Sequence, residues 1–170
     1  VLAAATDTVS PQPLVAAFPL PQPPALAEQQ GFCLALDCLQ DPGNMGSILR
    51  SGDALGADWL LLGLGCADPY APKTLRSAMG STFHLPLVQV ENLPAAMEKM
   101  AEGDYLFLAG DLRGEDTLPR AMPRNTALVI GNEGNGISPE VLARCQHRYR
   151  LPKQGRAESL NASALLALSV

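Results

Sequence analysis

The sequence predicts an α/β domain, a parallel sheet flanked by helices. Short apolar segments alternate along the chain with segments that carry helix-start signals. The apolar segments lack a regular polar alternation, as expected for strands that are buried on both faces. Strands that alternate with helices are typical of parallel sheets. The chain has 170 residues, of which 47% are hydrophobic, which is enough for one domain with a substantial core.

The regular pattern begins at Phe32 and continues to the C-terminal part of the chain. Strands are predicted at residues 32–37, 59–63, 85–90, 105–110, 128–130 and 149–151. Helices are predicted from Asn44 to about Leu55, over residues 72–79, from Asn92 to about Met100, from Ser138, and from about Ser159. The first of these follows a D-P-G-N turn, and Asn44 is placed to cap it. Residues 1–30, rich in Ala, Pro and Gln, are predicted to be a linker or edge segment.

Composition narrows the classes of function. The net charge of −5 argues against a domain that binds nucleic acid through its overall field. A local basic cluster is formed by Arg144, Arg148, Arg150, Lys153 and Arg156. It is consistent with contact to a nucleic-acid backbone, but a solvated surface is the simpler explanation.

Three further signals bear on metal sites, redox state and membranes. The four cysteines include no C-x-x-C pair, which favours unpaired thiols in a reducing cytoplasm. His84 and His147 have no metal-ligand spacing, so no metal is expected. No segment is long and apolar enough to cross a bilayer, so no membrane association is expected.

The segment 127–140, A-L-V-I-G-N-E-G-N-G-I-S-P-E, is the strongest candidate for a site. A short strand ends in a glycine-rich loop, after which Ser138 and Pro139 suit the start of a helix. Such loops at the carboxyl ends of strands are where open α/β sheets bind ligands. The signatures of phosphate loops are missing, and Glu133 would repel phosphate and favour a cation. An ordinary strand-to-helix turn remains the alternative.

Two other loops carry polar residues that folding alone does not require. Arg50 is the only basic residue among the first 72 and lies on an otherwise apolar helix, so it calls for an acidic partner or an anionic ligand. Asn161 and Ser163 fall among alanines and leucines after Ser159, where polar groups need partners.

Three motifs in these loops resemble those of the SpoU-type RNA 2′-O-ribose methyltransferases of the SPOUT, or trefoil-knot, superfamily. They are D-x-x-x-D-P-G-N-x-G-x-I-L-R-S-x-D-A-L-G, L-V-I-G-N-E-G-x-G-I-S and L-P-x-x-G-x-x-E-S-L-N-A-S, at residues 37–56, 128–138 and 151–163. The segment R-S-A-M-G-S-T-F-H-L-P, residues 76–86, also matches the family. The similarity covers nearly all of residues 32–168, with the motifs in the family's order.

The resemblance implies a knotted catalytic domain at residues 31–170, with a deep C-terminal trefoil knot, and a homodimer. It implies S-adenosylmethionine as the cofactor and no metal. Arg50, Glu133, Asn161 and Asn44 match catalytic or site-organising positions, with Glu133 and Asn161 holding Arg50. The cofactor is expected to contact Leu108, Ala109, Gly110, Ile130, Gly131, Asn132, Gly134, Leu151, Ser159, Leu160 and Asn161.

The implied function is transfer of a methyl group from S-adenosylmethionine to a ribose 2′-OH of ribosomal or transfer RNA in the cytoplasm. Arg50, Arg113, Lys153 and Arg156 are the residues expected to contact RNA. Residues 1–30 would then follow a small N-terminal RNA-binding domain that this sequence lacks. A non-catalytic RNA-binding or assembly module that keeps the fold is the alternative.

Overall fold

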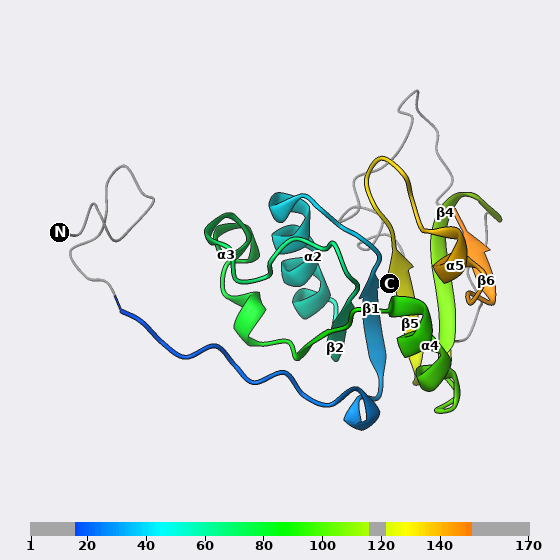
Figure 1. Cartoon of the computed structure of the whole chain (residues 1–170), viewed down its shortest axis with the longest axis horizontal. Helices are drawn as coiled ribbons and strands as arrows, with labels where there is room; N and C mark the ends of the chain where they lie inside the picture. The colour runs from blue at the N-terminus through cyan, green and yellow to red at the C-terminus, as the bar shows by residue number, and fades with distance from the viewer. Residues whose placement is uncertain (1–15, 116–121, 151–170) are drawn as a thin grey trace.

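The computed structural model describes residues 16–115 and 122–150. These residues form three layers, a parallel sheet with helices on both faces (Figure 1). The predicted fold class, a parallel sheet flanked by helices, is therefore confirmed. The predicted knot falls on residues 151–170, outside the described residues, and stays a prediction.

The sheet has six strands in the order β3-β2-β1-β5-β4-β6, and each neighbouring pair is parallel. The strands are β1 (Phe32–Leu36), β2 (Trp59–Leu62), β3 (Leu87–Gln89), β4 (Leu106–Glu115), β5 (Thr126–Ile130) and β6 (His147–Tyr149). Every residue of β2 and β5 is buried. This agrees with their continuous apolar sequences, which are typical of strands covered on both faces.

Helices α2 (Pro42–Ala54) and α3 (Pro72–Ala78) cover one face of the sheet. Helices α4 (Leu93–Ala101) and α5 (Pro139–Leu142) cover the other, as Figure 1 shows. Two short 3₁₀ turns, η1 (Leu26–Glu28) and η2 (Ser81–Phe83), complete the described elements. None of the helices in the described ranges is long and apolar enough to span a membrane.

The core consists of two separate clusters because strand side chains alternate between the faces. From β1, Leu34 and Leu36 pack on the side of α2, where they join Ile48. Cys33 and Ala35 point the other way, into the cluster that contains α4 and α5. The helices are thus fixed against opposite faces, and the loops that connect them to the strands meet at the edges of the sheet.

Helices α2 and α3 approach so closely that only glycine fits at one contact. A Cβ atom on Gly46 would lie 2.4 Å from Ser77 Cβ and 2.5 Å from the Thr74 carbonyl oxygen. The Ser77 hydroxyl also donates a hydrogen bond of 2.9 Å to the Gly43 carbonyl. This contact holds the first turns of α2 in place at the carboxyl edge of the sheet.

Most element boundaries differ from the prediction by one or two residues, and two differences bear on the site. The cap of α2 is Asp41, whose carboxylate accepts a 2.8 Å hydrogen bond from the backbone N–H of Asn44, so the prediction of Asn44 as the cap was wrong. Pro42 then occupies the first turn of the helix, the position where proline is favoured. Strand β4 continues past Gly110 to Glu115, through a segment predicted as a loop, because it pairs with β6.

All four cysteines are free thiols, as predicted. Burial raises the pKa of the Cys33 thiol well above its usual value and raises that of Cys145 to about 12. The pKa of Cys66 is also raised by burial. These thiols therefore belong to the packing of the domain.

Candidate functional site

The carboxyl ends of β1 and β5 lie side by side in the middle of the sheet. From β1 the chain first builds β2 and β3 on one side, and later places β5 and β4 on the other. In open α/β sheets, ligands bind at such a switch point. The backbone N–H of Asp37 donates a 2.8 Å hydrogen bond to the Ile130 carbonyl, so the loops that follow β1 and β5 begin in contact.

Asn132 folds the loop after β5 into a compact turn. Its backbone N–H and C=O both pair with Gly136, at 2.9 Å each. Its side-chain oxygen accepts hydrogen bonds from the N–H groups of Gly134, at 2.9 Å, and Asn135, at 3.0 Å. Four N–H groups of the turn are thus bonded within it. A phosphate cradle requires free N–H groups, so this loop is unsuited to phosphate.

The turn needs glycine where its two ends meet. A Cβ atom on Gly131 would lie 2.3 Å from the carbonyl carbon of Gly136, closer than any side chain allows. Gly136 itself has a φ of +72°, in the left-handed region that favours glycine. At Gly134, by contrast, the nearest atom to an added Cβ is 3.6 Å away.

Two side chains connect this turn to the loop after β1. The Asn132 side-chain amide donates to the Cys38 carbonyl, at 2.9 Å. The Asp37 carboxylate accepts a 2.7 Å hydrogen bond from the backbone N–H of Ser138, at the start of α5. Sequence reasoning did not select Asp37, although it is the first residue of the first motif. Ser138 and Pro139 begin α5 as predicted, but the Ser138 side chain makes no capping bond.

Glu133 extends from the turn to the N-terminus of α2. Its carboxylate accepts hydrogen bonds from the Asn44 side-chain amide, at 3.0 Å, and from the Asp41 backbone N–H, at 3.4 Å. Negative charge is stabilised at the N-terminus of a helix. The Asp41 carboxylate is also at this position, and its pKa is lowered by the hydrogen bond from the Asn44 N–H and by Lys73.

Arg50 lies apart from this group. It is exposed on α2, and within the described ranges it makes no ion pair. It follows Asn44 by six residues, which corresponds to about 9 Å along the helix and about 240° around it. The expected contact between Glu133 and Arg50 is not formed among these residues, and Asn44 is the partner of Glu133 instead.

The end of β4 lies beside the turn. Leu108 and Ala109 pair in register with Leu128 and Val129 of β5, so Gly110 reaches the same edge as Ile130. Leu108, Ala109 and Ile130 are buried and contribute only backbone at this edge. Leu151, Ser159, Leu160 and Asn161, the other expected cofactor contacts, lie outside the described residues.

Of the residues expected to contact RNA, Arg113 lies on β4 with its side chain 87% exposed and its Nε 3.8 Å from Asp111 Oδ1. Lys153 and Arg156 fall outside the described ranges. In the part of the chain that the structure describes, no group of three His, Cys, Asp or Glu residues is placed to hold a metal ion.

The family model of the SpoU rRNA methylases matches residues 31–169 of this chain. The chain belongs to the SpoU rRNA methylase family. Among curated relatives, the 23S rRNA (guanosine(2553)-2′-O)-methyltransferase of Bacillus subtilis is 36% identical over 98% of this chain and 66% of its own length. The 23S rRNA (uridine(2479)-2′-O)-methyltransferase of Streptomyces viridochromogenes is 41% identical over 72% of this chain and 45% of its own. The chain therefore spans between about half and two thirds of these relatives.

Solved structures agree with this membership. A TrmH-family structure from Porphyromonas gingivalis superposes with a TM-score of 0.88, at 32% identity, covering 99% of this chain and 68% of that one. The SpoU methyltransferase AviRb from Streptomyces viridochromogenes, in complex with AdoMet, superposes with a TM-score of 0.75, at 34% identity, covering 82% and 58%. The parallel sheet with helices on both faces is thus the fold of this SpoU family.

Proposed function

We propose that this chain is the catalytic domain of an enzyme that transfers a methyl group from S-adenosylmethionine to a ribose 2′-OH of ribosomal or transfer RNA. The observation that carries the proposal is the turn of residues 131–136, four of whose N–H groups are bonded within it and whose Glu133 carboxylate lies at its rim. Such a site disfavours phosphate and tolerates a cation. Family membership and the named activities of the two 23S rRNA relatives support the same conclusion.

The residues of this edge fit the cofactor. S-Adenosylmethionine, when bound, supplies the methyl group on a positively charged sulfur. Gly134 exposes backbone without a side chain, which lets adenine and ribose approach closely, while the space beside Gly131 is filled by Gly136. Leu108, Ala109 and Gly110 would provide the neighbouring wall, and Leu151, Ser159, Leu160 and Asn161 the remaining contacts.

The protein's own contribution is to position the RNA. Glu133 and Asn44 hold the turn against α2 and therefore fix the wall of the cofactor site. Arg50 carries a cationic guanidinium that donates but does not accept hydrogen bonds. We assign it to binding the substrate phosphate and stabilising the 2′-oxygen as its proton passes to that phosphate, with Arg113, Lys153 and Arg156 as further contacts to the RNA backbone.

We also propose that the protein acts as a homodimer in the cytoplasm. The position of Arg50 supports the dimer, because α2 directs it away from Glu133 and leaves it exposed. The described residues of one chain bring no arginine to its own cofactor site. The Arg50 of a second copy would supply it. Sedimentation at micromolar concentration should give the mass of two chains, and a monomer would contradict this proposal.

Calorimetry with S-adenosylmethionine and with S-adenosylhomocysteine tests the function. Binding of both is expected, and absence of binding at millimolar ligand would refute it. Arg50→Ala should leave this binding intact and abolish methylation by the full-length protein, whereas retained turnover would refute the role of Arg50. RNA binding without cofactor binding or methyl transfer would instead favour the non-catalytic module. Mapping the 2′-O-methyl marks lost on deletion of the gene would identify the RNA.

A further inference from the structure

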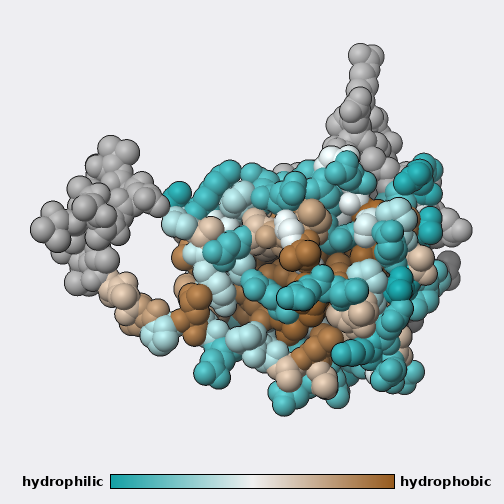
Figure 2. Space-filling view, viewed as in Figure 1, coloured by the Kyte–Doolittle hydropathy of each residue, from teal (hydrophilic) through white to brown (hydrophobic). Residues whose placement is uncertain are grey.

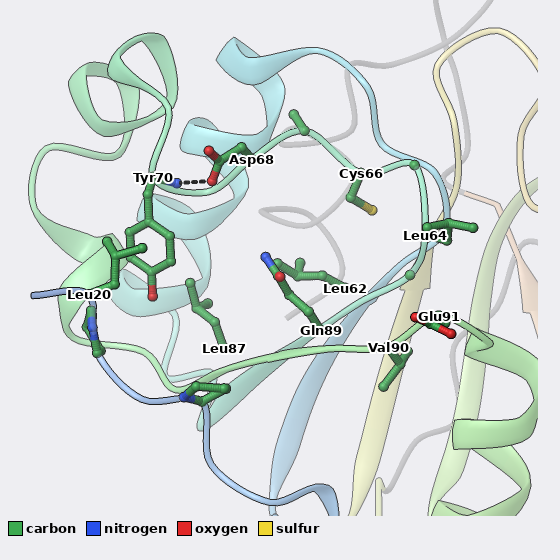
Figure 3. A pocket seen from close by; sticks show the side chains of 15 residues that line it. Leu20, Leu62, Leu64, Cys66, Asp68, Tyr70, Leu87, Gln89, Val90 and Glu91 are labelled. Carbon is green, nitrogen blue, oxygen red and sulfur yellow. Dashed lines mark hydrogen bonds between the residues drawn. The ribbon is translucent and has the colours of Figure 1, made fainter.

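A second cavity, of about 760 Å³, lies at the carboxyl ends of β2 and β3, on the other side of β1 from the turn (Figure 3). Leu62 and Leu87 form its floor, the Tyr70 ring lies at one side, and Leu20 approaches from the N-terminal segment. Apolar side chains also gather around a central hollow on the face that Figure 2 presents. The volume is in the range of about 300–1,000 Å³ found for small-molecule sites.

This cavity shares a wall with the candidate cofactor site. The loop after β2 lines it, and this loop is hydrogen-bonded to the loop after β1. The backbone N–H of Gly63 donates to the Leu36 carbonyl, at 2.9 Å, and that of Ala67 donates to the Leu39 carbonyl, at 2.8 Å. The same loop after β1 receives the Asn132 side chain, at Cys38. The two sites are therefore neighbours along one edge of the sheet.

The lining of the cavity selects against anions. Its charged side chains are the carboxylates of Asp68 and Glu91, and none of the described residues that line it is a lysine or arginine. The Gln89 side chain extends into it, and in the described part of the chain this amide has no hydrogen-bond partner. Apolar walls with acceptor groups and a free amide suit a flat, neutral molecule that presents N–H donors at its edge.

A lysine lies near both sites, paired with Asp41. Lys73, in the first turn of α3, follows Tyr70 of the cavity closely in sequence and is 62% exposed. Its ammonium group is 3.1 Å from Asp41 Oδ2, at the N-terminus of α2 where Glu133 is bound. A phosphodiester that connects ligands in the two sites would meet this cation, while its charge would be kept out of the acidic cavity.

We propose that the cavity binds an unpaired nucleobase of the RNA, close to the nucleotide whose ribose is methylated, and thereby contributes to substrate selection. This inference rests on the proposed function. Guanine, adenine and cytosine would present amino groups to the Glu91 carboxylate and to the Asp68 oxygen that is not bonded to the Tyr70 N–H. Uracil has one N–H between two carbonyl oxygens, which would face those carboxylates, so it should bind more weakly.

The test is a titration of the ¹⁵N-labelled chain by NMR, with the cofactor site first saturated by S-adenosylhomocysteine. Guanosine is expected to shift the resonances of Gly63, Gly65 and the Gln89 side chain. Uridine should bind at least about fivefold more weakly, and inorganic phosphate should leave these resonances unchanged. Gln89→Leu, which removes the amide from an exposed position, should weaken guanosine binding about tenfold.

The matched control is Gln30→Leu, which changes another exposed glutamine at the opposite, amino end of β1 and should leave the affinity unchanged. Equal weakening of guanosine binding by both variants, or the absence of shifts at Gly63 and Gly65, would overturn the proposal. Binding of S-adenosylhomocysteine would still support the proposed function in that case. Failure of S-adenosylhomocysteine to bind would count against the proposed function, and guanosine titration of the unliganded chain would then decide whether the cavity binds a base.

Discussion

The side-chain amide of Asn44 donates a 3.0 Å hydrogen bond to the Glu133 carboxylate, across 89 residues of sequence. It connects the N-terminus of α2 to the turn after β5. The first two family motifs are therefore in contact, and the position of the turn depends on the position of the helix.

Replacing Asn44 tests this connection. Asn44→Ala removes one hydrogen bond to a carboxylate and should lower the free energy of unfolding by about 1 kcal/mol. Asn44→Asp should be more damaging, because it places a second carboxylate against Glu133. Urea denaturation measures both. If Asn44→Asp were as stable as Asn44→Ala, the contact would not contribute as described.

The turn after β5 should depend on Asn132 far more than on Asn135. Asn132→Ala removes the acceptor of two backbone N–H groups and the donor to the Cys38 carbonyl. We expect at least a tenfold loss of S-adenosylhomocysteine affinity by calorimetry. Asn135 is exposed, and within the described residues its side chain makes no hydrogen bond. Asn135→Ala is therefore the control, and an equal loss in both variants would contradict this assignment.

The two glycines Gly131 and Gly134 should differ in their tolerance of alanine. Gly131→Ala would place a Cβ 2.3 Å from the backbone of Gly136 and should destabilise the domain by about 1–3 kcal/mol. Gly134→Ala meets its nearest atom at 3.6 Å and should change stability by less than about 0.5 kcal/mol. Thermal denaturation of the pair is the measurement, and a reversed order would show that the turn is packed differently.

Acid should remove the stabilising charge of Asp41. Its pKa is lowered in the folded state, first by the Asn44 N–H and then by Lys73. A lowered folded-state pKa gives stability that is present above the unfolded-state pKa, about 3.9, and is lost as the pH falls through the folded-state value. Asp41→Asn keeps a capping side chain without the charge.

We therefore expect Asp41→Asn to lower the melting temperature at pH 7 and the difference from the parent to close between about pH 4 and pH 2. In a Lys73→Met background the difference at pH 7 should be smaller, because the second cause of the pKa shift is gone. A difference that stays constant with pH would exclude a role of the charge.

The thiols should be protected in the folded protein. Burial raises the pKa of Cys145 to about 12, and complete burial raises the pKa of Cys33 well above its usual value. Since the thiolate is the reactive form, iodoacetamide at pH 8 should label these two residues much more slowly than in the urea-unfolded chain. Mass spectrometry of peptides from both states gives the rates. Equal rates in the folded and unfolded chains would show that the core opens readily.

The sheet was predictable because strands buried on both faces must be apolar throughout, as Leu60, Leu61 and Leu62 of β2 are. The cap of α2 was assigned to the wrong residue, since Asp41 and Asn44 are both good caps. Pro42 would have decided between them, because proline favours the first helical position. The end of β4 was missed because its polar residues indicate a loop, and only pairing with β6 keeps it extended.

The sequence located the candidate site but not its contacts. The glycine pattern and the motif order selected the turn, and the charge of Glu133 argued against phosphate, as does the internal hydrogen bonding of the turn. The partner of Glu133 lies 89 residues away, so no local pattern could identify Asn44. Asn132 was expected to offer backbone to the cofactor, which stays a prediction, but the role of its side chain in folding the turn was not foreseen.

The central position of β1 also constrains the order in which the protein can fold. Its two neighbouring strands are synthesised at very different times. Strand β2 follows soon after β1, whereas β5 comes much later, as the contact of Cys38 with Asn132 shows by joining residues 94 positions apart. On the ribosome, the nascent chain must carry β1 with one open edge until β5 emerges. Such high contact order slows folding and exposes the growing chain to aggregation.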